Sequence, residues 1–368
     1  MKSRLFLDVH AIQTVPPANI NRDDTGSPKT AQYGGVTRAR VSSQSWKSEM
    51  RKYFTENTEN EGIRTLRLAE GVAKEILKQK PSKTYEECLK LSTDMLEKYT
   101  VKKDGSIKKV FKSNEEFKIK AFFFSSRKQL KGLADLAISG EYDKDKIKEI
   151  LKDEQSIDIA LFGRMLADDP SLNEDASSQV AHAISTHAIE SEFDFFTAVD
   201  DLAPGDNQGA GMLGTIEFNS STLYRYANIA LHEFVKQMRD KESTVNAAKL
   251  FVEAFINSMP TGKINSFANQ TLPQAVIVTL RKDRPVNMVS AFEKPIKSND
   301  GYVEKSIKRL FEEYPKYDGM LEEPLFTAYY TFGDYGIQEI GKNKNSTKEL
   351  IKELGEEINK YLDKIELE

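Results

Sequence analysis

The sequence predicts an α+β fold with a large helical insertion. Runs with strand-like patterning open the chain and return in its second half. The stretch between them, about 62–166, has apolar residues at helical spacing instead. Without that stretch the order of elements is β-α-β-β-α-β, which is the split βαβ or ferredoxin-like arrangement, a core often used to bind single-stranded RNA.

The first element is an expected strand at 4–12, RLFLDVHAI, which is short and rich in apolar side chains. A polar stretch from 14 to 35 follows, with several prolines and the Gly34–Gly35 pair. Such a long connection predicts a loop with a function of its own.

Ser42 or Ser43 is expected to cap a helix that runs to about Tyr53. Lys47 and Arg51 are four residues apart, so they lie on one face of that helix.

The insertion predicts four or five amphipathic helices, interrupted by a hairpin-like segment at 101–110, VKKDGSIKKV. Lysine and glutamate alternate on the polar faces of these helices, which is typical of a solvated surface.

The second half predicts a long hairpin, because strand-like runs at 192–202 and 214–229 flank the glycine-rich connection 203–213. A helix at 243–259 and a strand at 274–282 are expected next. The last helix opens with Ser346 and Glu349, a capping box. Its apolar stripe is formed by Leu350, Leu354, Ile358, Leu362 and Ile365.

The composition is that of a soluble globular protein, with 39% hydrophobic and 30% charged residues. A single cysteine, Cys88, excludes an internal disulfide framework and indicates a reducing compartment. The N-terminus lacks the pattern of a signal peptide, and no run approaches the ~20 apolar residues of a membrane-spanning helix. We expect a cytoplasmic protein with no membrane partner.

Charge is distributed unevenly along the chain. The formal net charge is -4, yet the window from Lys29 to Lys52 holds six basic residues and one acid, Glu49. The window therefore carries +5 and the remainder -9. The basic residues are Lys29, Arg38, Arg40, Lys47, Arg51 and Lys52.

This basic window also contains the hydroxyl and amide side chains of Ser42, Ser43, Gln44 and Ser45. Such a mixture, placed at a helix start, is typical of contacts to phosphate oxygens. The glycine pair would let the backbone approach a bulky ligand. Five neutralised phosphates on a single strand predict a log–log salt slope of roughly -3.5. Pairing of the basic turns with the acidic body is the structural alternative.

Signals for catalysis are weak. The chain has four histidines and lacks H-E-x-x-H, a cysteine pair and G-x-S-x-G, so we expect no metal site and no cofactor. Adjacent carboxylates at 23–24, 168–169 and 200–201 could hold a divalent cation or act as turn residues.

Several segments resemble one known family as a composite. They are NINRDDTGSPKTAQYGGVTRARVSSQSWKSEMRK, SIDIALFGRM, HAISTHAIESEFDFFTAVDDL, LGTIEFNSSTLYRYANI and SAFEKPI. Together they resemble the CasC family, the backbone subunit of the type I-E CRISPR Cascade complex. The resemblance runs nearly end to end and is weakest at about 62–150 and after 300.

The resemblance implies a non-catalytic, RRM-like palm at 1–59 and 181–368, a helical finger domain at 60–180 and a hairpin thumb at about 193–222. It further implies several copies aligned head to tail along one CRISPR RNA in a ribonucleoprotein with other Cascade subunits. The RNA backbone is held so that its bases can pair with the target DNA strand in antiviral defence.

Carried over to this chain, the resemblance assigns guide contacts to Arg22, Lys29, Ser42, Gln44, Lys47 and Arg51. Met165 stands where the family places an apolar side chain against a displaced nucleotide, although its spacing equally fits a core methionine. Further candidates are Arg164, Lys263 and Lys294. Trp46 replaces an expected aliphatic residue and either packs or stacks on a base. Finger lysines that could touch DNA are Lys118, Lys120, Lys128 and Lys131.

Two enzymatic alternatives stay open. Related proteins of type III complexes cut RNA with a loop aspartate, so Asp23 or Asp24 could serve a metal-dependent ribonuclease. A nuclease that processes precursor CRISPR RNA would need a base, for which His182 and His187 are the candidates.

Overall fold

The computed structural model describes residues 4–60, 62–153, 155–198 and 212–364. The chain divides into two compact units. The first comprises Met1–Tyr53, Val180–His232 and Ala248–Glu368, and the second comprises Phe54–Gln179 and Glu233–Ala247. Each unit is described separately below.

The first unit contains a large sheet with the strand order β14-β13-β12-β1-β11-β9-β3-β2, while β8 and β10 also pair with β11. The strands are β1 (Phe6–Ala18), β2 (Thr30–Tyr33), β3 (Val36–Val41), β8 (Ser178–Val180), β9 (Ala183–Ser185), β10 (Glu192–Ala198), β11 (Met212–Ala230), β12 (Pro273–Arg281), β13 (Phe326–Thr331) and β14 (Lys342–Asn343). The helices that start or lie in this unit are α1 (Ser43–Asn57), α7 (Leu231–Met238), α9 (Ile264–Phe267), α10 (Val303–Glu313) and α11 (Thr347–Leu362), with 3-10 turns η2 (Met288–Phe292) and η3 (Tyr314–Tyr317). Helix α8 (Lys241–Asn257) begins in the second unit and ends in the first.

The core of this sheet has the split βαβ topology. Strand β1 pairs antiparallel with both β11 and β12, and β9 pairs antiparallel with β11. Strands β1 and β9 are therefore parallel with β11 between them, and β11 and β12 are parallel with β1 between them. This confirms the predicted α+β, ferredoxin-like class. The second strand of that core is β9, however, and not the predicted 192–202 segment.

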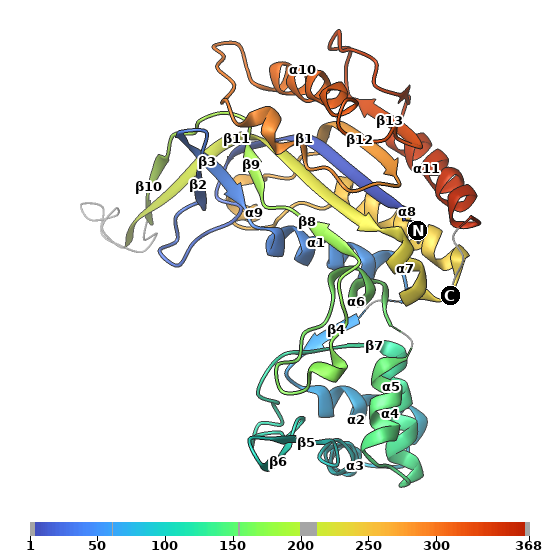
Figure 1. Ribbon diagram of the computed structural model, residues 1–368. Coiled ribbons are helices and arrows are strands. Elements are labelled where there is room, and N and C mark those ends of the chain that lie inside the picture. The colour runs from blue at the N-terminus through green and yellow to red at the C-terminus, as the bar shows by residue number, and fades with distance from the viewer. Residues whose placement is uncertain (1–3, 61, 154, 199–211, 365–368) are drawn as a thin grey trace. The chain divides into compact units, whose positions relative to one another are not determined.

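The two faces of the sheet are covered by different helices (Figure 1). On one face Ile12 and Ile277 join a hydrophobic cluster with Leu310 and Phe311 of α10. On the other face the guanidinium of Arg225 lies 3.7 Å from the ring centroid of Trp46 in α1 and 4.3 Å from that of Phe255 in α8. Helices α1 and α8 therefore pack on the face opposite α10.

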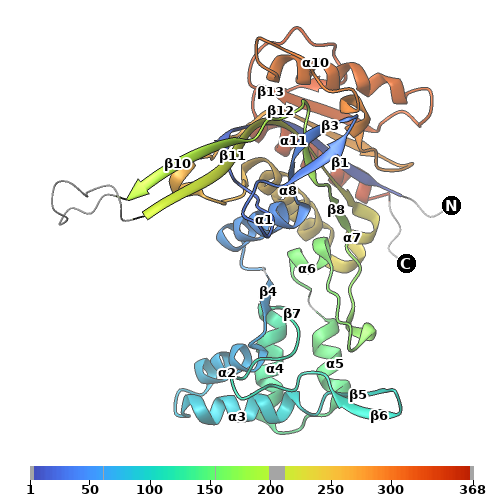
Figure 2. The same cartoon turned by 90° about the vertical axis from the view of Figure 1, so that its left-hand side faces the viewer.

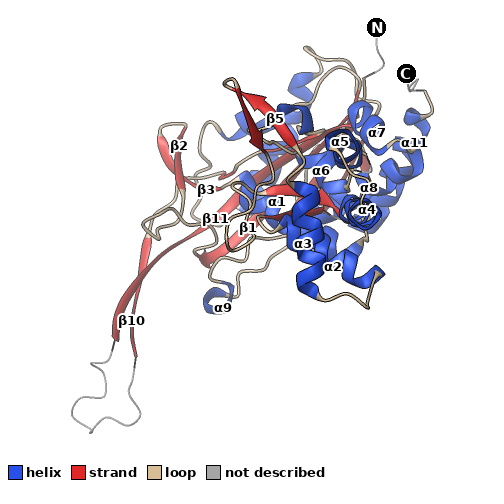
Figure 3. Cartoon of the chain, turned by 90° about the horizontal axis from the view of Figure 1, so that it is seen from below, coloured by secondary structure: helices blue, strands red, loops and turns tan. Residues whose placement is uncertain are grey.

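The predicted hairpin is built from β10 and the first part of β11, and Figure 3 shows it as a ribbon that projects from the sheet. Residues from Glu192 to Ala198 pair antiparallel with residues from Phe218 to Met212. The rest of β11 continues into the sheet beside β1. Most of the predicted tip, 203–213, lies outside the described residues.

The second unit is mainly helical (Figure 2). Its hydrophobic cluster includes Val72 of α2, Leu89 of α3 and Leu133 of α4. The 101–110 segment forms the predicted hairpin, and a second pair, β4 and β7, was not predicted. The elements are β4 (Gly62–Thr65), α2 (Leu68–Gln79), α3 (Tyr85–Leu96), β5 (Thr100–Lys103), β6 (Ser106–Lys109), β7 (Phe123–Ser126), α4 (Arg127–Ser139), α5 (Lys144–Lys152), α6 (Ile157–Phe162) and η1 (Pro170–Leu172).

The C-terminal helix matches its prediction closely. Ser346 caps α11 by accepting a hydrogen bond from the Glu349 N–H. Four stripe residues are buried, Leu350, Leu354, Ile358 and Leu362, while Ile365 lies outside the described residues. No helix in the described part of the chain is long and apolar enough to cross a bilayer.

A buried carboxyl lies in the middle of the sheet. Asp8 accepts hydrogen bonds from the Tyr226 hydroxyl at 2.7 Å and the Val286 N–H at 3.1 Å, and the Arg281 Nε lies 3.9 Å away. Burial raises the pKa of Asp8 to about 7, against the opposing effects of these neighbours. The folded state therefore favours the protonated acid well above the usual pKa of an aspartate.

We predict that Asp8 makes stability fall as pH rises. Between about pH 4 and 7 the unfolded chain has already lost this proton while the folded chain keeps it, so the free energy of unfolding declines, by up to about 4 kcal/mol. Urea unfolding at several pH values measures this. Asp8→Asn should flatten this part of the profile, and an unchanged slope in that variant would assign the effect to another group.

Candidate nucleic-acid interface

The loop after β1 is fixed against its surroundings by two asparagines. Asn19 donates from Nδ2 to the carbonyls of Gly26 at 2.9 Å and Glu217 at 2.8 Å. The Oδ1 of Asn21 accepts from the Ser42 N–H at 2.9 Å. The stretch that the sequence predicted as a long loop is thus an ordered segment attached to the start of α1.

The β2–β3 hairpin brings two of the predicted cations together. The N–H of Arg40 donates to the carbonyl of Lys29 at 2.9 Å, so these residues lie opposite each other at the base of the hairpin. The turn consists of Gly34 and Gly35, which both have positive φ, as a two-residue type I′ turn requires.

Gly34 has a second reason to be glycine. A Cβ at this position would lie 1.7 Å from the carbonyl oxygen of Glu293. The sequence predicted that the glycine pair would let the backbone approach a bulky ligand. At Gly34 the close neighbour is instead the protein's own Glu293 carbonyl, and at Gly35 nothing lies within 4 Å of a Cβ.

Lys29, Arg40 and Lys47 form a cationic cluster around His182. Arg40 Nη1 lies 3.2 Å from the Nδ1 of His182, and its Nε donates to the Thr30 carbonyl at 3.0 Å. Burial lowers the pKa of His182, and the charges of Arg40, Lys29 and Lys47 lower it further. Cations of the loop after β1, the β2–β3 hairpin and α1 thus produce one field of positive potential around His182.

The start of α1 contributes directional donors beside this cluster. Its first turn contains no acidic residue, so the backbone N–H groups there keep their positive polarity. Ser42 and Ser43 are buried and Gln44 is exposed. Lys47 and Arg51 follow on the helix and are half-buried. An anion placed at this end would meet both charge and N–H donors.

Two predicted RNA contacts require correction, Arg38 and Arg164. Arg38 is buried and donates to the carbonyls of Tyr33, Ser185 and Phe292. Its guanidinium holds the β2–β3 hairpin to the body of the first unit and is not available to a phosphate.

Arg164 has a similar structural role in the second unit. It is 4% exposed and donates to the carbonyls of Leu172 at 2.9 Å and Leu151 at 2.8 Å. Its Nη2 also lies 3.6 Å from a carboxylate oxygen of Glu174. Both arginines therefore donate to buried backbone carbonyls and stabilise the fold.

The other predicted contacts are at least partly accessible, except Ser42, which is 5% exposed. Arg22, Lys263 and Lys294 are exposed in the first unit. Lys263 follows Gly262, where a Cβ would lie 2.4 Å from the Ile20 carbonyl oxygen, so it neighbours the loop after β1. In the second unit Met165 is 82% exposed, which excludes the core alternative for this side chain.

Trp46 packs and does not offer its ring to a base, because it is buried against Arg225. Sequence reasoning missed Arg225, Asn21 and His182 as parts of this region. His182 and Asn21 lie within segments quoted for the resemblance, but only the fold brings them beside the basic window.

Two of the groups named for the enzymatic alternatives, Asp23 and His187, have other partners. The Oδ1 of Asp23 accepts from the N–H groups of Thr25 and Ser27, and the Thr25 hydroxyl bond lowers its pKa. His187 is buried, and its Nε2 accepts from the Thr222 N–H at 3.0 Å. Among the described residues no group of three or more His, Cys, Asp or Glu side chains could hold a metal ion.

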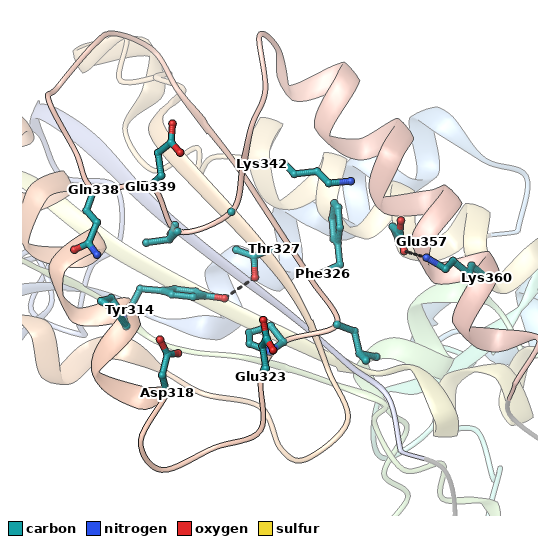
Figure 4. Close-up of a pocket in the computed structure, with 15 residues that line it drawn as sticks. Tyr314, Asp318, Glu323, Phe326, Thr327, Gln338, Glu339, Lys342, Glu357 and Lys360 are labelled. Atoms are coloured by element: carbon teal, nitrogen blue, oxygen red, sulfur yellow. Dashed lines mark hydrogen bonds and ion pairs between the residues drawn. The ribbon is translucent and has the colours of Figure 1, made fainter.

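A pocket of about 680 Å³ opens elsewhere in the first unit, between η3, β13 and α11 (Figure 4). Its lining includes four acids, Asp318, Glu323, Glu339 and Glu357, and two lysines, Lys342 and Lys360. This excess of negative charge makes the pocket unsuited to a polynucleotide backbone.

Comparisons with known proteins agree with this picture. A solved chain described as part of a "CRISPR RNA-guided surveillance complex, pre-nicking" is 31% identical, covers 95% of this chain and 99% of its own, and superimposes with a TM-score of 0.85. Another, described as "CRISPR RNA-guided surveillance complex", is 27% identical with the same coverage and a TM-score of 0.75. No curated protein matches. The resemblance noted in the sequence is confirmed at the level of a chain of such complexes.

The family-model comparison covers most of the sequence. The model of the CT1975-like proteins matches residues 7–357. The chain therefore belongs to the family of CT1975-like proteins.

Proposed function

We propose that the chain is the non-catalytic backbone subunit of a type I-E Cascade complex, the CasC subunit, and that it binds CRISPR RNA. The observation that carries this proposal is the cationic cluster of Lys29, Arg40 and Lys47 beside the acid-free start of α1. Cationic side chains and N–H donors bind phosphates whatever the base sequence of the RNA. A protein that must accept any guide requires contacts of this kind. The similarity to chains of CRISPR RNA-guided surveillance complexes supports it.

The wider arrangement follows from this role. Copies of the chain align head to tail along one guide, since a heterologous contact that does not close builds a filament. We propose the palm, fingers and thumb at the boundaries expected from the sequence, with β10 and the first part of β11 as the arms of the thumb, although the helical unit also includes Glu233–Ala247. The bound guide pairs with the target DNA strand, and other Cascade subunits complete the complex in the cytoplasm.

Copurification tests the proposal. The full chain, expressed with its sister subunits and a CRISPR array, should elute with a discrete small RNA whose length does not depend on the guide sequence. The same preparation should leave matched RNA uncut in Mg²⁺. Cleavage that disappears in Asp24→Ala would instead favour the ribonuclease.

We predict that RNA binding tightens as pH falls. His182 is neutral at pH 7 because burial and the neighbouring cations lower its pKa. A phosphate bound by Arg40 would offset these charges and release the Nδ1, which raises the pKa of His182. Binding then takes up a proton, so affinity should rise roughly threefold between about pH 7.5 and 5.5.

Fluorescence anisotropy with labelled RNA across this pH range measures the effect. His182→Gln should bind RNA with a flat pH profile. A profile that keeps its slope in this variant would place the titrating group elsewhere.

A further inference from the structure

A small pocket lies at the base of β11, beside the cationic cluster. Lys29 and Arg40 line it together with Asn219 and Ser221 of β11. Its volume is about 10 Å³. A space of this size holds one water-sized group, such as a single oxygen with its hydrogen.

The side-chain amide nitrogen of Asn219, a residue that lines this pocket, is unpartnered. The residue is 5% exposed, and its Nδ2 is buried with no hydrogen-bond partner. It lies opposite Ala18 at the point where the register between β1 and β11 shifts. The extra residue of this bulge is on β1, because three steps from Val15 to Ala18 lie against two steps from Ser221 to Asn219, and the regular pairing is interrupted beside Asn219. A buried amide donor without an acceptor is unfavourable, so the pocket is suited to a group that accepts from it.

The walls of the pocket restrict which group fits. Val15, Ile20 and Val41 are apolar and line it. A charged phosphate oxygen is better matched by Lys29 and Arg40, which are half-buried and also line the pocket, than by the buried Asn219 amide between these apolar walls. A neutral hydroxyl fits better, because it accepts from the Nδ2 of Asn219 and can donate to the Oγ of Ser221.

The position of the pocket identifies the source of that hydroxyl. Lys29 and Arg40 line the same pocket and are cations that would hold backbone phosphates. Along an RNA strand every phosphate lies next to a ribose 2′-hydroxyl, which is the group that distinguishes RNA from DNA. The four side chains together match one sugar-phosphate unit of RNA.

We propose that this pocket receives a ribose 2′-hydroxyl of the bound strand, with Asn219 as donor and Ser221 as acceptor, and thereby selects RNA over DNA. The inference rests on the proposed function, because it requires a strand held at the cationic cluster. It adds a subsite for the sugar to contacts that otherwise bind only the charged phosphates.

The test compares the full-length chain on single-stranded RNA and on single-stranded DNA of the same sequence at low ionic strength. Wild type should bind the RNA about tenfold more tightly. Asn219→Ala should lose most of this preference by weakening RNA binding while DNA binding stays unchanged. Ser221→Ala should act in the same direction. Removal of an unpaired amide should leave the melting temperature unchanged or higher, so loss of folding is not expected to obscure the result.

Ser220→Ala is the matched control, since Ser220 is the exposed residue between the two on the same strand, and it should keep the preference. The ratio of RNA affinity to DNA affinity could instead stay unchanged in Asn219→Ala and Ser221→Ala. The pocket would then hold only a permanent water, which overturns the inference but not the proposed function. If wild type binds neither strand, the proposed function fails first.

Discussion

Replacing Lys29 and Lys47 together with alanine is expected to weaken single-stranded RNA binding by roughly 25-fold at about 0.1 M monovalent salt. Each lost phosphate contact removes about 0.7 from the log–log salt slope, which is roughly fivefold in affinity at this concentration. Both lysines lie close enough to His182 to influence its titration, so both belong to one field. Anisotropy titrations at several salt concentrations measure affinity and slope together.

The loss should be equal for guides of unrelated sequence, because phosphates carry no sequence information. Lys52→Ala serves as the control on the same helix, since Lys52 is paired with Glu49 at 2.8 Å and should change affinity little. A loss confined to some guide sequences, or a slope that stays the same in the double variant, would contradict the role given to these lysines.

Gly34→Ala is expected to lower the free energy of unfolding by about 3 kcal/mol or more. Its φ is +61°, which costs an L-residue about 1–2 kcal/mol. Its new Cβ would also lie 1.7 Å from the Glu293 carbonyl oxygen, so the hairpin must move. That movement would separate Arg38 from the Phe292 and Glu293 carbonyls, to which it donates. Chemical denaturation measures the change.

A variant at the neighbouring Gly35 distinguishes the cost of the steric clash from the cost of the positive φ. Gly35 has a similar φ of +77°, yet a Cβ there meets nothing within 4 Å. Gly35→Ala should therefore cost only about 1–2 kcal/mol. Equal losses in the two variants would mean that contact with Glu293 is unimportant. RNA affinity should fall further in Gly34→Ala, because the hairpin carries Lys29 and Arg40 at its base.

Elements with strong local patterns were predictable from the sequence. The helix after Ser42, the insertion and the last helix have clear periodicity or caps, and all are present. Strand β9 was not predictable, because three residues give no pattern, and its place in the sheet depends on pairing with β11. Strand β3 was not predicted, because the charged residues of VTRARV leave no clear strand pattern between the expected loop and the expected helix.

The site was predictable as a segment but not as a surface. The basic window indicated Lys29, Arg40 and Lys47. Charge alone could not show that Arg38 of the same window is structural, with a buried guanidinium that donates to backbone carbonyls. Charge also could not identify His182 or Asn219, which lie more than a hundred residues after the basic window. They are brought beside the window by the pairing of β9 and β11 in the sheet. Tertiary pairing, which no local pattern encodes, decides which polar side chains meet.

The salt dependence of RNA affinity tests the central claim most directly. Arg38 is buried and Lys52 is paired with Glu49, so we assign the phosphate contacts of the basic window to its other four cations, Lys29, Arg40, Lys47 and Arg51. The full-length chain should bind single-stranded RNA of any sequence at low ionic strength, with a log–log slope of roughly -2.8. An absence of binding at low salt, or affinity that depends on base sequence and not on salt, would contradict a cationic surface that grips the guide backbone.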